Sequence, residues 1–205
     1  YWTLETDLDG IPVVISRTGW TGEMGYEIYL RDPSRGNELW EYIMEAGKPH
    51  NIRPIAPCEA RKIEAGILNH GQSMTIANNP YEIMGFERLV EDQSSDYIGK
   101  QALAKIKQEG VKQRMVGIKV ALERTALWME DSWSVYKNGK QIGKITDLAW
   151  SPRLEQNIGY VWIQTEHSYP GIELEIHSVD GRLKGVTSEI PFIDPKKKTP
   201  SVKLY

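Results

Sequence analysis

One stretch of the sequence carries residue types that could bind a flat, polar ligand. Residues 16–29 hold three glycines within seven positions, with Trp20 and Glu27 beside them. Glycines let a ligand approach the backbone closely, an indole offers a stacking face, and a carboxylate can accept two parallel hydrogen bonds from an aminopyrimidine edge. The same stretch could instead be a tight loop whose Trp packs in the core. On these residues alone both interpretations stay open.

Other kinds of site find little support in the composition. The 205 residues include 1 Cys and 4 scattered His, so neither a disulfide framework nor a metal site is expected. Glu23 and Glu27 could form an acid–base pair, but Glu23 lies in the loop and no Gly-x-Ser-x-Gly elbow accompanies them. The net charge of -3 gives no attraction to nucleic acid, and no apolar run approaches the roughly 20 residues that span a bilayer.

The elements that must position these residues change in type along the chain. Residues 1–110 mix strands and helices, with a hairpin expected at 2–17 around Asp9-Gly10 and helices over 32–47, 58–69 and 99–109. Residues 111–195 read as six short strands, typical of a small antiparallel β-barrel, and 196–205 as a solvated tail. The predicted fold class is α+β, with two domains that meet near residue 110.

Several motifs, in this order along the chain, resemble those of the glycine cleavage T-protein family, the folate-dependent aminomethyltransferases. They are Thr18-Gly19-Trp20-Thr21-Gly22-Glu23-Met24-Gly25-Tyr26-Glu27, Lys62-Ile63-Glu64-Ala65-Gly66, Tyr97-Ile98-Gly99-Lys100-Gln101-Ala102-Leu103, Ser151-Pro152-Arg153-Leu154 and Ile190-Pro191-Phe192. The resemblance spans residues 1 to about 194. It implies the back part of a folate-binding domain followed by a C-terminal β-barrel domain.

The resemblance implies tetrahydrofolate as the cofactor. Glu27 would anchor the pterin, and Trp20 and Tyr26 would wall its pocket. The family's catalytic aspartate belongs to a front part that has no counterpart here, so no catalytic residue is assigned. The chain, which starts at Tyr1 without a Met, is therefore expected to be a fragment with little or no turnover by itself.

Further contacts to the cofactor are expected from two other segments. The family's folate-contacting arginine falls at Cys58, which is expected to be a buried, small apolar group instead. Arg61 or Lys62, on the same helix, could meet the glutamyl tail in its place. Trp150 packs on the barrel or between the domains in one interpretation, and contacts the cofactor in another.

The departures from the family pattern resemble a side branch, the dimethylsulfoniopropionate demethylases. They include Trp20, the uncharged Cys58 and the run Gly85-Phe86-Glu87. A related branch removes O-methyl groups from methoxyaromatics, and a non-catalytic folate-binding regulator is a further alternative. The expected partners are a small-molecule methyl or aminomethyl donor, the absent N-terminal segment and a lipoyl carrier protein, with neither nucleic acid nor membrane. A cytoplasmic location is expected, because no signal or transit segment is visible.

Overall fold

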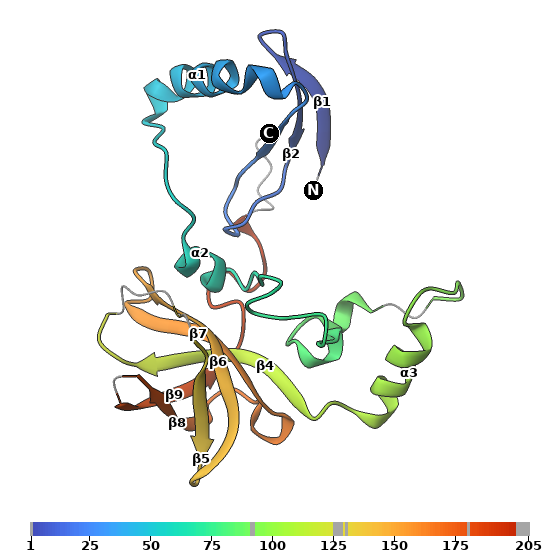
Figure 1. The fold of residues 1–205 in the computed structure, drawn as a ribbon, viewed down its shortest axis with the longest axis vertical. Coiled ribbons are helices and arrows are strands. Elements are labelled where there is room, and N and C mark those ends of the chain that lie inside the picture. Colours follow the sequence, from blue (N-terminus) through green and yellow to red (C-terminus); the bar gives the residue numbers. More distant parts are fainter. Residues whose placement is uncertain (1, 91–92, 125–128, 130, 180, 200–205) are drawn as a thin grey trace. The chain divides into compact units, whose positions relative to one another are not determined.

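The computed structural model describes residues 2–90, 93–124, 129, 131–179 and 181–199. The chain divides into two compact units (Figure 1): Tyr1–Cys58 together with the C-terminal segment that starts at Lys197, and Glu59–Lys196. The first unit holds the glycine-rich stretch, and the second holds the barrel with the helices that precede it. The domain boundary near residue 110 stays a prediction.

The first unit is a three-stranded antiparallel sheet with one helix packed on it. Its elements are β1 (Thr3–Leu8), β2 (Ile11–Ser16), β3 (Glu27–Leu30), the 3-10 turns Pro33–Arg35 and Lys48–His50, and α1 (Gly36–Gly47), with the strands paired in chain order. Asp9 and Gly10 have φ angles of 53° and 74°, as a two-residue hairpin turn requires. The predicted hairpin and first helix are confirmed.

The alternation of side chains along β2 and β3 decides what each face of this sheet does. Ile11 and Val13 are buried against Leu39 of α1, and Leu30 packs beside them. Since successive strand residues point to opposite faces, Glu27 and Tyr29 share the other face. Both are exposed there, so this face is open to a ligand.

The second unit begins with short helical elements. These are α2 (Glu59–Glu64), the 3-10 turns Pro80–Glu82 and Glu87–Leu89, and α3 (Lys100–Glu109). The third predicted helix is confirmed as α3, but the helix predicted over 58–69 is too long. It ends at Glu64 because Gly66 takes a left-handed φ of 67°, and a Cβ there would press on Pro191 at 3.1 Å.

The rest of the second unit is a closed six-stranded antiparallel barrel, as predicted. Its strands are β4 (Gln113–Ala121), β5 (Trp133–Lys137), β6 (Lys140–Ser151), β7 (Gln156–Gln164), β8 (Glu173–Ser178) and β9 (Gly181–Ser188), with the 3-10 turn Thr165–His167 after β7. They close in the order β4-β7-β6-β5-β8-β9. The predicted turn at Asn138-Gly139 joins β5 to β6, whereas Asp180 of the other predicted turn lies outside the described residues. The α+β fold class is confirmed.

Two apolar clusters hold this unit together. One fills the barrel and includes Val116, Ile145 and Ile176, all fully buried. The other includes Ile63 of α2 together with Tyr160 of β7, so it joins the helix to the outer side of the barrel wall. Helix α2 is thereby fastened to strands β6 and β7, which also carry Trp150 and the polar residues described below.

Candidate functional site

The glycine-rich stretch forms a loop between β2 and β3 whose two ends are tied together by Arg17. Arg17 Nη1 donates to the Gly25 carbonyl oxygen at 2.7 Å, and the Arg17 backbone N–H donates to the Trp2 carbonyl oxygen at 2.8 Å. The guanidinium carbon lies 5.1 Å from the centre of the Tyr26 ring, within the range of a cation–π contact. Trp2 lies near the same ring, with 6.0 Å between ring centres. Tyr26 is therefore held between Arg17 and Trp2.

Glu27, the first residue of β3, has its carboxylate held by hydroxyl groups. Thr18 Oγ1 donates to Glu27 Oε2, and the Tyr29 hydroxyl donates to the same oxygen at 3.1 Å. Thr18 Oγ1 also lies 2.9 Å from Ser16 Oγ on the adjoining strand. Because both donors meet Oε2, the carboxylate has a defined orientation and can offer Oε1 to a ligand.

The same carboxylate acts on the tyrosine beside it. The hydrogen bond to Glu27, followed by the negative charge of Glu27, raises the pKa of Tyr29 above its usual value. The phenol therefore stays protonated at neutral pH and remains a hydrogen-bond donor to the carboxylate. A carboxylate that two hydroxyl donors hold in one orientation is suited to binding a polar ring edge.

Trp20 and Tyr26 are accessible. Their side chains are 45% and 47% exposed, and the apolar core of this unit is built without them. The interpretation that Trp20 packs in the core is therefore wrong. The segment 20–27 supplies two accessible aromatic rings and an oriented carboxylate.

Arg61 and Trp150 belong to the second unit. Arg61 lies on the exposed side of α2, and Trp150 is half-buried on β6, where it pairs with Asn157 of β7. Since α2 packs against β6, these two candidates lie on neighbouring elements. The predicted residues thus fall into two groups, one on the loop and strand of the first unit and one on the helix and barrel wall of the second.

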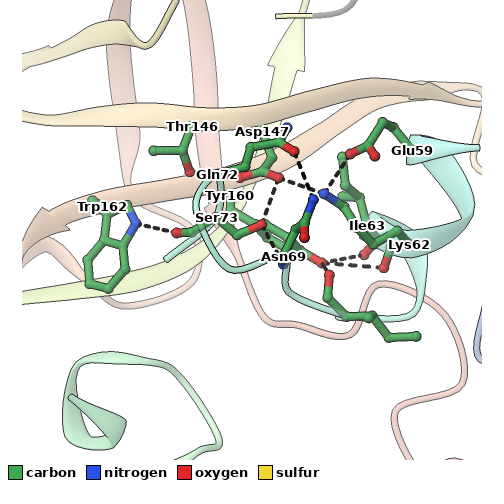
Figure 2. A network of polar contacts seen from close by, with 11 residues as sticks. Glu59, Lys62, Ile63, Asn69, Gln72, Ser73, Thr146, Asp147, Tyr160 and Trp162 are labelled. Atoms are coloured by element: carbon green, nitrogen blue, oxygen red, sulfur yellow. Dashed lines mark hydrogen bonds and ion pairs between the residues drawn. The ribbon is translucent and has the colours of Figure 1, made fainter. Parts of the chain in front are cut away.

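The inner side of α2 carries a buried charge network that the sequence patterns did not predict (Figure 2). Lys62 is fully buried, and its Nζ lies 2.9 Å from Asp147 Oδ1 and 2.6 Å from Glu59 Oε2. Asp147, also buried, accepts hydrogen bonds from Ser73 Oγ and from Thr146 Oγ1, each at 2.8 Å. Both charges are therefore paired and hydrogen-bonded, which buried charges require.

A β-bulge sets the direction of Asp147. Ile145 pairs with Val161 and Asp147 pairs with Tyr160, so Thr146 is the extra residue on β6. Gly159 lies opposite, and a Cβ there would overlap the Asp147 carbonyl oxygen. A glycine inside an apolar strand is a known sign of a bulge, so Gly159 is the sequence signal that could have revealed it.

Further polar contacts join this region to the barrel. Tyr160 OH donates to the carbonyl oxygen of Ile67, three residues after the end of α2, at 3.0 Å, and Trp162 Nε1 donates to the Ser73 carbonyl oxygen at 2.9 Å. Ser151 Oγ donates to the buried carboxylate of Glu64 at 2.6 Å. Burial, and next the charge of Asp147, raise the pKa of Tyr160, so it is a permanent donor. The predicted packing roles of Tyr160 and Trp162 are confirmed by their burial.

Two expectations about the tail-binding region were wrong. Cys58 is exposed rather than buried, because it precedes α2, and the helix turns Lys62 and Ile63 inward instead. Lys62 is enclosed by its carboxylate partners, so its ammonium cannot reach a ligand. Arg61 is therefore the remaining candidate on this helix.

Two further findings concern the part of the chain that the structure describes. No group of three or more His, Cys, Asp or Glu side chains is arranged there to hold a metal ion. None of the helices in the same residues is both long enough and apolar enough to cross a membrane.

Comparison with protein families identifies both parts of the chain. Residues 1–93 match the GCVT N-terminal domain, and residues 113–194 match the glycine cleavage T-protein C-terminal barrel domain. The first match contains the Glu27 segment and α2, and the second contains the whole barrel.

Similar proteins are found among bacteria and archaea. The chain is 32% identical over 213 residues to the probable aminomethyltransferase of Pyrococcus horikoshii, covering 93% of the chain and 53% of the relative. It is 35% identical over 206 residues to the aminomethyltransferase of Clostridium botulinum, and this match covers 97% of the chain and 54% of the relative. It is 34% identical over 191 residues to the aminomethyltransferase of Geobacillus sp. (strain WCH70), and this match covers 92% of the chain and 51% of the relative. The chain thus spans about half the length of these relatives.

A solved structure confirms the fold. The crystal structure of the glycine cleavage system aminomethyltransferase T from Bartonella henselae superposes with a TM-score of 0.80 at 20% sequence identity. The match covers 94% of this chain and 52% of that one.

Proposed function

Because the chain belongs to the glycine cleavage T-protein family, we propose that it binds tetrahydrofolate and takes part in transferring a one-carbon unit to it. The observation that carries this proposal is the carboxylate of Glu27. Thr18 and Tyr29 orient it through one oxygen, and the exposed rings of Trp20 and Tyr26 lie on the same short segment. The proposal includes two domain boundaries. One lies near residue 110, between the folate-binding part and the barrel domain, and the other near residue 195, between the barrel domain and the C-terminal tail.

The pterin ring suits these residue types. Its 2-amino group and neighbouring ring N–H form an edge of donors, from which the open Oε1 of Glu27 can accept a charge-assisted hydrogen bond. Its flat faces suit contact with Trp20 and Tyr26. When bound, tetrahydrofolate supplies N5 as the atom that receives the one-carbon unit. Glu27 would fix the ring, and the aromatic side chains would exclude water from it.

The other end of the cofactor carries carboxylates on its glutamyl tail. We assign Arg61 to this end, because it is the exposed cation of α2 and a guanidinium can bind a carboxylate through two parallel hydrogen bonds. Trp150 is proposed to contact the cofactor from β6, with barrel packing as the alternative role. The structure leaves Lys62 no part in this contact.

We propose a demethylase-type donor, meaning a small molecule whose methyl group is activated, such as a sulfonium. Support comes from Trp20, whose exposed ring can attract a cation by roughly 0.5–2 kcal/mol, whereas the ring of Tyr26 already contacts the Arg17 guanidinium. A methoxyaromatic donor would stack on the same rings, and an aminomethyl group delivered by a lipoyl carrier protein is the option closest to the named relatives. The alternative function is a folate-binding regulator without turnover. We expect the 205 residues alone to bind without turnover, because none of their carboxylates can be assigned to the reacting carbon.

Calorimetric titration with tetrahydrofolate under anaerobic conditions tests the proposal. Wild type should bind, and Glu27→Gln should weaken binding about 10- to 100-fold, the size expected for lost hydrogen bonds to a charged group. Glu41→Gln, an exposed residue of α1, removes the same charge elsewhere in the unit and should leave affinity unchanged. Absence of binding, or equal binding by wild type and Glu27→Gln, would refute the proposed site.

The donor and the regulator alternative are tested separately. The folate-bound chain is incubated with a dialkylsulfonium, with a methoxybenzoate, or with an aminomethyl-loaded lipoyl carrier, and 5-methyl- or 5,10-methylenetetrahydrofolate is measured by mass spectrometry. Methyl transfer from the sulfonium supports the demethylase-type proposal. The 205 residues alone are expected to give no product, so the same incubation is repeated with the N-terminal segment of an aminomethyltransferase relative added. Binding without product from any donor in that experiment contradicts the demethylase-type proposal and favours the regulator.

A further inference from the structure

The apolar face of the sheet in the first unit is longer than the helix that covers it. Residues that pair across the three strands share a face and form successive rows, Thr6–Val13–Leu30 and then Leu4–Ile15–Ile28. Val13 is fully buried and packs with Leu39 of α1, whereas Leu4 is 51% exposed and Ile28 is 36% exposed. Helix α1 therefore covers the end of this face near the hairpin turn and leaves the other end open.

Trp2 extends this uncovered surface by one more position. Its carbonyl oxygen accepts a hydrogen bond from the Arg17 N–H at 2.8 Å, which continues the pairing of β1 with β2. Side chains alternate along a strand, so Trp2 lies on the same face as Leu4, and its side chain is 48% exposed. Large apolar side chains that adjoin on an open surface are typical of an interaction site. Trp2, Leu4 and Ile28, which we call the open end, are therefore suited to an apolar partner.

We propose that the open end binds a helix of the polypeptide that forms the other half of the aminomethyltransferase relatives. The match to the Pyrococcus horikoshii protein covers 93% of this chain but 53% of that protein, and the match to the solved structure covers 94% and 52%. The matched part includes the C-terminal barrel domain of the family, so the unmatched half of the relatives is N-terminal. About half of each relative therefore lies outside the 205 residues, and the open end gives it an apolar surface on which to pack.

A single helix has the size of the open end. Same-face residues of a strand are about 7 Å apart, so Leu4 and Trp2 extend about 7–14 Å beyond Thr6, and a helix with its side chains is about 10–12 Å wide. Ile15, in the row of Leu4, is already partly buried against the core under α1, so a second helix would extend that core.

Helix α1 shows how such a helix would pack. Its residues Leu39 and Ile43, four positions apart, both contact the sheet core. We expect the docking helix to present a stripe of the same kind, with apolar side chains three or four positions apart, to Leu4 and Ile28. Since Glu27 and Tyr29 lie on the opposite face of the sheet, a helix here would leave them open to a ligand.

The test is co-purification of two polypeptides. The 205-residue chain carries an affinity tag and is co-expressed with the N-terminal half of the Clostridium botulinum aminomethyltransferase, and the retained half is quantified. Wild type should retain it in a 1:1 complex. Ile28→Asp should retain at least about tenfold less, because a carboxylate would be buried against an apolar helix face. Ile55→Asp, the same substitution at a side chain that is 86% exposed outside the sheet, should retain as much as wild type.

Further measurements separate docking from misfolding and from self-association. Circular dichroism confirms that the variants fold, and if Ile28→Asp does not, Leu4→Asp is measured in its place. Sedimentation equilibrium of the chain alone should show a monomer. A dimer that Ile28→Asp dissociates would make a second copy the occupant and overturn the proposal.

The co-purification has two refuting results. Wild type that retains none of the N-terminal half, or Ile28→Asp or Leu4→Asp that retains as much as wild type, shows that the open end is not the docking surface. The readout is retention of a polypeptide and not folate binding, so either result leaves the Glu27 proposal standing.

Discussion

The buried ion pair between Lys62 and Asp147 makes a sharp prediction about stability. Lys62→Met leaves the Asp147 carboxylate buried without a cation, which should cost about 5 kcal/mol, the upper end for a broken buried pair. Asp147→Leu should cost about 3 kcal/mol, because Lys62 keeps Glu59 at 2.6 Å, and the Glu59 side chain is 21% exposed. The double variant should lie within about 2 kcal/mol of wild type, since only the partly exposed carboxylate of Glu59 loses its cation. The coupling free energy, which is the sum of the two single costs less the cost of the double variant, is therefore about 6 kcal/mol or more.

The measurement is urea unfolding of the four proteins, followed by circular dichroism and by hydrogen exchange at the amides of β6 and β7. Exchange at these strands reports the stability of the barrel unit itself, so unfolding of the other unit does not blur the result. The matched control is a cycle on Lys105 and Glu109, an exposed pair of α3 with 3.8 Å between charges, which should show no measurable coupling.

The refuting results are equally specific. If the unfolding free-energy costs of the two single variants sum to the cost of the double variant, the two charges do not interact across the α2–barrel contact. The network in Figure 2 then has no energetic role. If Asp147→Leu lowers the free energy of unfolding much more than Lys62→Met does, Glu59 does not compensate the Lys62 ammonium for the loss of Asp147.

Three further predictions concern single residues of the barrel. Gly159→Ala should destabilise the barrel by about 1–3 kcal/mol through overpacking, because the added Cβ would overlap the Asp147 carbonyl oxygen. Calorimetry should show this as a lower melting temperature. Tyr160→Phe should cost about 1–3 kcal/mol in urea unfolding, because it removes the hydroxyl that donates to the Ile67 carbonyl oxygen. The hydrogen bond with His177 lowers the pKa of Glu175. The contribution of this contact to stability is therefore present above the unfolded pKa and is lost as the pH falls through the lowered pKa. In NMR titration His177→Phe should raise the pKa of Glu175 toward its usual value.

Each of these has a matched control. Gly36→Ala adds a methyl group where no atom lies within 4 Å and the backbone is helical, so it should not destabilise. Tyr169→Phe removes a hydroxyl from a side chain that is 63% exposed and should be neutral. For Glu175 the control is His167→Phe, which removes an imidazole that lies beside Glu166 instead and should leave the pKa of Glu175 lowered. An equal effect at target and control would contradict the assigned contact in each case.

The local patterns of the sequence determined most of the fold. Asp9-Gly10 and Asn138-Gly139 mark hairpin turns because their residues tolerate positive φ, and the structure has them there. Six short apolar runs after residue 110 became the six strands of the barrel, since one face of each had to be buried. The segment from Trp20 to Glu27 was recognisable for the same kind of reason: its residue types and their spacing lie within one continuous stretch.

What failed depended on contacts between distant residues. The helix predicted over 58–69 stops at Glu64 because Gly66 must make room for Pro191, which lies far along the chain. Cys58 and Lys62 exchanged their expected environments because the helix turned toward the barrel with a charged residue inward. A buried lysine is favourable only where a carboxylate meets it, and the partner, Asp147, is 85 residues away.

The sequence by itself therefore determined the elements, the family and the loop-and-strand segment that we propose to bind the pterin. The tertiary structure alone decided that Lys62 and Asp147 form a buried pair and that α2 is fixed to the barrel wall. The physical reason is the range of the forces involved. Backbone conformation and side-chain alternation are set by neighbours in sequence, whereas the free energy of a buried charge is set by whatever the fold places beside it.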